Sequence, residues 1–174
     1  MMIEREVYDP AHEGDLEAVR AWLQKNPGEL NSEISDGYSL LHIASAFGHE
    51  TMVAFLLGRH ALVNLNANNQ SEATPLHLAV AYREEDVANR ITQMLVANGA
   101  ELNAKQRGGQ TALHHAVGRG SELLTETLIL AGGDPFIKDD QGRAATDVAK
   151  QGEYSAEPLL QLLKKAHSLT QAAR

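Results

Sequence analysis

The sequence predicts an all-α solenoid of about five stacked helix-turn-helix units in one domain, residues 1–174. Three stretches repeat one phrase: Ser39-Leu40-Leu41-His42-Ile43-Ala44, Thr74-Pro75-Leu76-His77-Leu78-Ala79 and Thr111-Ala112-Leu113-His114-His115-Ala116. The spacing of the phrases is close to the ~33 residues of a solenoid repeat, whose units bury their apolar faces only by stacking. Between the phrases, apolar residues recur at i, i+3 and i+4, which is typical of helices.

The first unit, residues 9–33, is a degenerate copy without the phrase. Gly14 and Asp15 are expected to form its turn, and Val19, Trp22 and Leu23 lie on one face of the helix that follows. Acidic side chains crowd this end of the chain: Glu4, Glu6, Asp9, Glu13, Asp15 and Glu17. The atypical pattern is expected of a unit that caps a stack.

The middle units, residues 34–66, 67–105 and 106–138, each begin with a turn and then the phrase. The Ser or Thr of the phrase is expected to cap a short first helix, and Pro75 suits the first turn of such a helix. The third unit is longer than a regular one around residues 83–90. Either an extra helical turn or a longer connection accommodates this insertion.

The second helices of these units are expected to end at residues with left-handed backbone. Gly99 and Gly132 follow two of them, where glycine is favoured. His60 occupies the equivalent place in the second unit, and histidine tolerates this conformation better than most residues. Leu56 and Leu95, which precede these positions, are predicted to lie in the core.

The last unit, residues 139–167, departs from the pattern. Asp147 replaces the histidine of the phrase, and the capping threonine is missing, so this unit is expected to be less firmly tied. A helix from Ser155, with Pro158 in its first turn, is expected to close the stack.

The phrase and its surroundings resemble the ankyrin repeat from about Asp9 to about Lys165. The resemblance implies that His42, His77 and His114 form hydrogen bonds between neighbouring units and are structural. It also implies that a protein partner is bound by the hairpin tips and the exposed face of the first helices, a concave strip. The candidate partner-binding residues at these places are Tyr38, Phe47, Tyr82, Arg107, Gln110, Arg119, Asp140, Gln141 and Arg143.

Exposed aromatic and arginine side chains are common hot spots of interfaces. For Phe47 and Tyr82 the alternative is packing against a neighbouring unit. Charge is also uneven along the chain, because basic residues gather in the later units: Lys105, Arg107, Arg119, Lys138 and Arg143. This polarity could orient a partner, although solvation of the surface explains it nearly as well.

Composition argues against several other functions. The net charge is −8 and no basic tract occurs, so nucleic acid is not an expected partner. No stretch approaches the ~18 apolar residues of a membrane span, and the first residues do not resemble a signal peptide, so we predict a cytoplasmic protein without a membrane partner. The chain has no cysteine, and neither His12 nor His49 has a second histidine at zinc-motif spacing, so no metal or cofactor is expected.

No catalytic residue is predicted. Gly118-Arg119-Gly120 lacks the Lys-Ser/Thr of a phosphate loop, and no nucleophile elbow occurs, so a small-molecule substrate is not expected. The sequence therefore favours a non-catalytic protein-binding module that regulates, inhibits or chaperones one partner. Two alternatives stay open: a secreted effector that blocks a host protein, and an enzyme whose site no motif reveals.

Overall fold

The computed structural model describes residues 3–151 and 161–163. Helices dominate this part of the chain: α1 (Ile3–Glu13), α2 (Leu16–Lys25), the short 3-10 helix η1 (Pro27–Glu29), α3 (Leu40–Ala46), α4 (Glu50–Gly58), α5 (Pro75–Ala81), α6 (Glu85–Ala97), α7 (Ala112–Gly118), α8 (Glu122–Leu130) and α9 (Ala145–Gln151). Within the described ranges no residue belongs to a β-strand, and only two isolated bridges occur, Ser35 with Tyr38 and Lys138 with Ala144. The predicted all-α class is confirmed.

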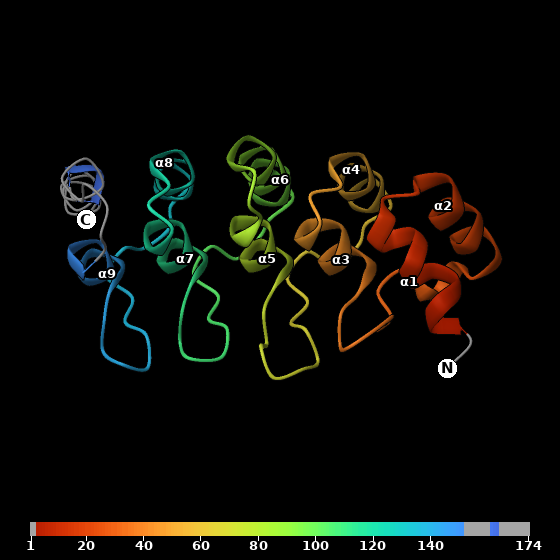
Figure 1. Cartoon of the computed structure of the whole chain (residues 1–174), viewed down its shortest axis with the longest axis horizontal. Coiled ribbons are helices and arrows are strands. Elements are labelled where there is room, and N and C mark those ends of the chain that lie inside the picture. Colours follow the sequence, from red (N-terminus) through yellow and green to blue (C-terminus); the bar gives the residue numbers. More distant parts are fainter. Residues whose placement is uncertain (1–2, 152–160, 164–174) are drawn as a thin grey trace.

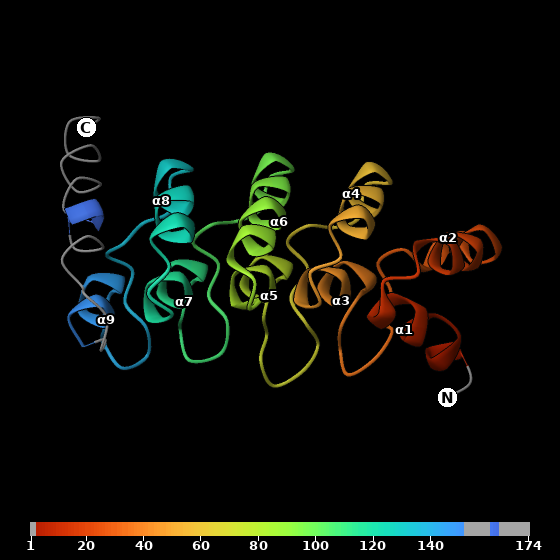
Figure 2. The same cartoon turned by 45° about the horizontal axis from the view of Figure 1, so that its top comes forward.

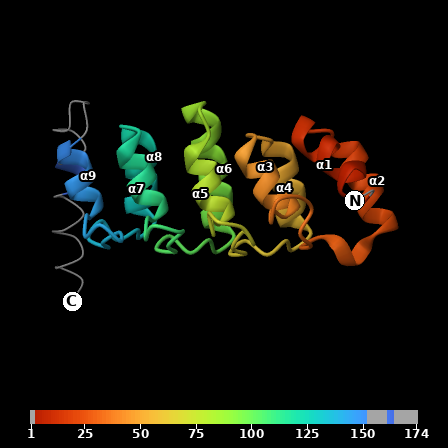
Figure 3. The same cartoon turned by 60° about the horizontal axis from the view of Figure 1, so that its bottom comes forward.

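The helices form two rows, and the hairpins form a third (Figures 1 and 2). The first helices α3, α5, α7 and α9 follow one another from right to left in Figure 1, and the second helices α4, α6 and α8 lie above them. The hairpins between units succeed each other along one edge, as Figure 3 also shows. No helix among the described residues is long and apolar enough to cross a membrane.

The repeated phrase builds the start of α3, α5 and α7 in the same way. At α5, the backbone N–H of Thr74 donates to Nδ1 of His77 at 3.2 Å, and the Thr74 hydroxyl lies 2.8 Å from the same nitrogen. Since Nδ1 accepts, the ring proton must be on Nε2, which donates to the carbonyl of Gln110 in the next unit at 3.1 Å. Each phrase therefore caps its own helix and ties it to the following hairpin.

His42 and His114 occupy the same position of the phrase as His77, and these three are called the framework histidines here. His42 and His114 repeat the geometry of His77. Nε2 of His42 donates to the carbonyl of Ala73, and Nε2 of His114 donates to the carbonyl of Arg143, both at 3.0 Å. In the last unit Asp147 stands in place of the histidine and takes over the capping of its own helix. Its carboxylate accepts from the N–H of Ala144 at 3.1 Å. The structural role that the resemblance implied for the three histidines is confirmed.

The second helices end as predicted. His60, Gly99 and Gly132 have φ values of 65°, 85° and 106°, all in the left-handed region. The residue after each of them donates its N–H back into the helix, and the three bonds are Ala61 to Leu56, Ala100 to Leu95 and Gly133 to Leu128, at 2.9–3.0 Å. This is the Schellman arrangement, which satisfies carbonyls at the helix end. Leu56 and Leu95 are completely buried, as expected.

The insertion of the third unit lengthens a helix. α6 has 13 residues, whereas α4 and α8 have nine each, so an extra helical turn absorbs the added residues. Within this segment Arg90 forms a bidentate pair with Glu50 of α4, with N to O distances of 2.7 and 2.8 Å. The longer helix thereby gains a contact to its neighbour.

The two ends of the stack differ from the pattern of the middle. α1 begins at Ile3, ahead of position 9, so α1 and α2 form a complete helix pair. The helix expected from Ser155 lies mostly outside the described residues; within it, residues 161–163 are helical and Leu163 is buried in the core.

The hairpin tips are joined by backbone hydrogen bonds. The N–H of Asn68 donates to Gly37, that of Arg107 to Ser71, and that of Asp140 to Gly108, at 2.8–3.0 Å. Gly37 has a φ of 78°, and a Cβ there would lie 2.4 Å from the backbone of Asn68. Glycine is thus required by both the backbone conformation and the close approach. These bonds keep the tips in line beside the first helices.

Candidate partner-binding face

The face of the stack formed by α1, α3, α5, α7 and α9 with the hairpins is called here the first-helix face. It carries three hollows, each lined by side chains from at least two units. They bring together six of the nine predicted residues: Tyr38, Phe47, Tyr82, Gln110, Arg119 and Arg143. The other three lie on hairpin tips and are exposed: Arg107, Asp140 and Gln141.

The aromatic hollow lies between α1, α3 and the hairpin that precedes α3, and it has a volume of about 240 Å³. Its lining residues are Tyr8, Asp36, Tyr38, His42, Ile43, Ala46, Phe47 and Leu78. Asp36 is held at the left-handed φ of 48°, and its backbone carbonyl accepts from the Asn69 side chain at 2.7 Å. One carboxylate therefore stands in a hollow of mainly apolar and aromatic groups.

The turn hollow, of about 430 Å³, lies where α1, α3 and α5 end. The ring of Phe47 meets the His12 ring edge-on at 4.1 Å between centroids, yet 39% of Phe47 is exposed. The half-buried Tyr82 covers Gly48, where an added Cβ would lie 2.4 Å from the Tyr82 ring. Tyr82 thus packs against the preceding unit, whereas Phe47 packs and also presents its ring to solvent.

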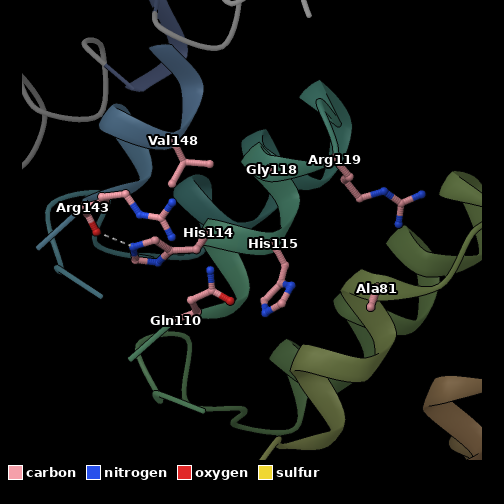
Figure 4. A pocket seen from close by; sticks show the side chains of 8 residues that line it. All are labelled: Ala81, Gln110, His114, His115, Gly118, Arg119, Arg143 and Val148. Atoms are coloured by element: carbon pink, nitrogen blue, oxygen red, sulfur yellow. Dashed lines mark hydrogen bonds between the residues drawn. The ribbon is translucent and has the colours of Figure 1, made fainter. Parts of the chain in front are cut away.

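The histidine hollow, of about 420 Å³, lies between α5, α7 and α9 (Figure 4). The amide of Gln106 donates to Nε2 of His115 at 2.8 Å, so this nitrogen carries no proton. Burial, and to a lesser degree the charge of His114, lowers the pKa of His115 below its usual value. At neutral pH this hollow therefore holds a neutral imidazole between two arginines, Arg119 and Arg143 (Figure 4).

Arg119 is a structural residue. Its guanidinium points toward α5 in Figure 4 and donates to the carbonyls of Val80 and Tyr82 from Nη1 and of Arg83 from Nη2. Carbonyls at a helix C-terminus lack partners within the helix, and a cation there also interacts well with the helix dipole. We therefore exclude Arg119 from the proposed contact surface, although its type and position suggested a hot spot.

Arg143 is likewise engaged within the chain. Its Nε and Nη2 donate to one oxygen of Asp139 at 3.0 and 2.8 Å, and the Asp139 side chain is 1% exposed. Burial alone raises the pKa of Asp139, but the N–H groups of Arg143 and Gln141 and the guanidinium outweigh this effect and hold the pKa below its usual value. The pair fixes the last hairpin, and Arg143 remains one-third exposed at the edge of the histidine hollow.

Several contributors to the hollows were not among the predicted residues, among them Tyr8, His12, Asp36 and His115. Tyr8 and His12 belong to α1, which the repeat pattern does not reveal because this unit lacks the phrase. One local signal exists: Val7 and Ala11 are buried and lie four residues apart, the spacing of a helix face, which places Tyr8 and His12 beside that face. His115 directly follows His114 in the sequence, and this position alone does not predict that its side chain lines a hollow.

The described residues contain no group of three or more His, Asp or Glu arranged to hold a metal ion. Burial lowers the pKa of both His42 and His77 to about 4, so these imidazoles are neutral at pH 7. Their two ring nitrogens are already used by hydrogen bonds in the scaffold. The first-helix face can therefore contact a partner through aromatic rings, one carboxylate and cationic side chains.

Comparison with known proteins agrees with this architecture. A family profile described as ankyrin repeats (3 copies) matches residues 9–91, and a second described as ankyrin repeats (many copies) matches residues 76–129. The chain belongs to the ankyrin-repeat family. Ankyrin repeats are in general modules for protein–protein interaction.

Several curated proteins are similar to this ankyrin-repeat chain. The Caenorhabditis elegans transient receptor potential cation channel subfamily A member 1 homolog is 30% identical over 81% of this chain and 11% of its own length. The B-cell lymphoma 3 protein homolog of Mus musculus is 35% identical over 64% of this chain and 24% of its own length. A putative ankyrin repeat-containing protein of Treponema pallidum is 28% identical over 79% and 44%. The chain thus spans less than half of each of these relatives.

Proposed function

We propose that this ankyrin-repeat chain is a non-catalytic binding module that recognises a protein partner through its first-helix face and hairpin tips and so regulates that partner. The observation that carries the proposal is that three hollows on one face draw side chains from successive units. Open hollows spread over successive units suit a polypeptide better than a small molecule, which is normally enclosed by one pocket.

The proposed contact residues are those that the fold leaves exposed. Phe47 is 39% exposed and lines two of the hollows, and the exposed tip residues are Arg107, Asp140 and Gln141. Because the backbone of each tip is fixed by hydrogen bonds to its neighbour, these side chains need little further ordering on binding. Arg119 and Arg143 support the face from within.

The proposed partner is a protein. A regulatory role agrees with the similarity to the B-cell lymphoma 3 protein homolog and to the nuclear factor NF-kappa-B p105 subunit of Rattus norvegicus. Nucleic acid, membrane and small molecules are not proposed partners. The cytoplasmic location stays a prediction.

Photo-crosslinking tests this proposal. A photoreactive phenylalanine analogue is placed at Phe47 on the first-helix face or, as a matched control, at Leu130, which is 74% exposed at the end of α8. In native cell extract, position 47 should give a saturable adduct with a discrete protein that unlabelled chain competes away, and position 130 should not. Equal adducts from both positions would show that the first-helix face is not the binding site.

A second experiment removes the ring of Phe47 or reverses the charge of Arg107. The Phe47→Ala and Arg107→Glu variants should lose the adducted protein in pull-down, because hot-spot energy is concentrated in a few aromatic and arginine residues. Arg107 is exposed on a hairpin tip, so the melting temperature of Arg107→Glu should stay close to that of the parent, whereas Phe47→Ala also removes the ring contact with His12 and should lower it slightly. Retention of the protein by both variants would reject these contact residues.

A further inference from the structure

The aromatic hollow has the composition of a site for a cationic side chain. Three rings, of Tyr8, Tyr38 and Phe47, come from α1, the hairpin and the end of α3, and they line one space of about 240 Å³. The face of an aromatic ring carries negative potential and attracts a cation within about 6 Å of its centre. Rings on several sides of a small space can therefore act on one cation together.

Charge in and around the aromatic hollow favours the same ligand. The one formally charged lining residue is Asp36, and no lining residue is Lys or Arg. Among the described residues no hydrogen bond or ion pair engages the Asp36 carboxylate; its recorded partner, Asn69, binds the backbone carbonyl. The adjoining helix α1 adds exposed acids at Glu6, Asp9 and Glu13.

The remaining polar lining group does not oppose a cation. His42 accepts from Ser39 through Nδ1 and donates to Ala73 through Nε2, so its ring is fixed and presents no free donor to the hollow. Burial lowers the pKa of His42 to about 4, so the ring carries no charge at neutral pH. Ile43, Ala46 and Leu78 supply apolar surface for the aliphatic part of a side chain.

We propose that the aromatic hollow binds an arginine side chain of the protein partner, with the guanidinium stacked on the rings and paired with Asp36. This inference rests on the proposed function, because it assumes that the first-helix face meets a polypeptide. Arginine is favoured over lysine because its planar guanidinium stacks on rings, matches a carboxylate with two donors, and is more weakly hydrated than an ammonium.

Peptide titration tests the inference without the native partner. Three acetylated and amidated alanine-rich peptides differ only at a central residue, which is arginine, lysine or citrulline, the neutral isostere of arginine. Amide shifts of the isotope-labelled chain are followed by NMR. The arginine peptide should bind saturably with a dissociation constant in the millimolar range, shifting amides around Tyr38 and Ala46, and citrulline should bind about fivefold more weakly, equivalent to ~1 kcal/mol.

Two substitutions separate the two halves of the site. Asp36→Asn removes the charge and keeps a residue that tolerates the left-handed φ of 48°, and Phe47→Leu removes the ring and keeps apolar bulk. Each should weaken the arginine peptide at least about threefold. The matched controls Glu126→Gln and Phe136→Leu, both at exposed positions away from the hollow, should not change binding.

Equal binding of the arginine and citrulline peptides, tighter binding of the lysine peptide, or no saturable binding of the arginine peptide would overturn the inference. Equal loss in the control variants would do the same. These outcomes are distinct from failure of the proposed function. If position 47 crosslinks to a native partner while the arginine peptide does not bind, the binding face stands and the arginine assignment falls.

Discussion

Acid should destabilise the ankyrin stack through its framework histidines, and His77 offers the sharpest test. His77 is 2% exposed, and burial lowers its pKa from 6.5 to about 4. The unfolded chain therefore binds the proton more tightly than the folded chain. Stability from this residue is complete above pH 6.5 and is lost as the pH falls toward 4.

The size of the effect follows from the shift. One pKa unit corresponds to 1.36 kcal/mol, so at pH 4.5 His77 should have lost about 2.5 kcal/mol of the free energy of unfolding relative to pH 7.5. His42 has the same shift, so the two together should lose about 5 kcal/mol. Since domains are typically stable by about 5–15 kcal/mol, the loss is large enough to measure directly.

The perturbation that isolates His77 is His77→Gln, because glutamine does not titrate and its amide can still donate to the carbonyl of Gln110. At pH 7.5 this variant should be about 1–3 kcal/mol less stable than the parent, since the N–H of Thr74 loses its acceptor. At pH 4.5 the difference should shrink by about 2.5 kcal/mol.

Urea unfolding followed by circular dichroism at both pH values measures these differences, with Gln141→Ala, an exposed position whose side chain does not ionise, as the control. The control should follow the parent at both pH values. A gap between parent and His77→Gln that stays constant within about 0.5 kcal/mol would refute the reasoning, because it would mean that the folded chain accepts the proton as readily as the unfolded chain.

Three further outcomes test the scaffold by thermal or urea unfolding. Leu95→Ala should cost about 2–5 kcal/mol because Leu95 is fully buried, and a cost below about 0.5 kcal/mol would contradict its place in the core. Arg119→Met should lower the free energy of unfolding by about 1–3 kcal/mol, because three carbonyls at the end of α5 lose their donor. An unchanged melting temperature would mean that these bonds do not stabilise the fold. His60→Gly should gain about 0.5–1 kcal/mol by relieving a φ of 65°, and destabilisation would show that the His60 side chain makes a compensating contact.

The sequence alone determined the repeating scaffold. The caps formed by Thr74 with His77, and the left-handed residues His60 and Gly99, follow from requirements within a few neighbouring residues. A donor three positions from its acceptor, or a φ that only certain residues tolerate, is visible in the local sequence. The repeat then places each copy in the same role.

The tertiary structure decided which of the predicted contact side chains also form hydrogen bonds within the chain. The guanidinium of Arg119 binds carbonyls at the end of α5, and that of Arg143 binds Asp139, four residues before it in the sequence. The aromatic hollow joins Tyr8, Tyr38 and Phe47 across two units, and α1 itself carries no repeat signal. The contacts of Arg119, and the approach of Tyr8 to Tyr38, join residues about one repeat apart, and they depend on how the helices stack, which a local pattern of residues does not encode.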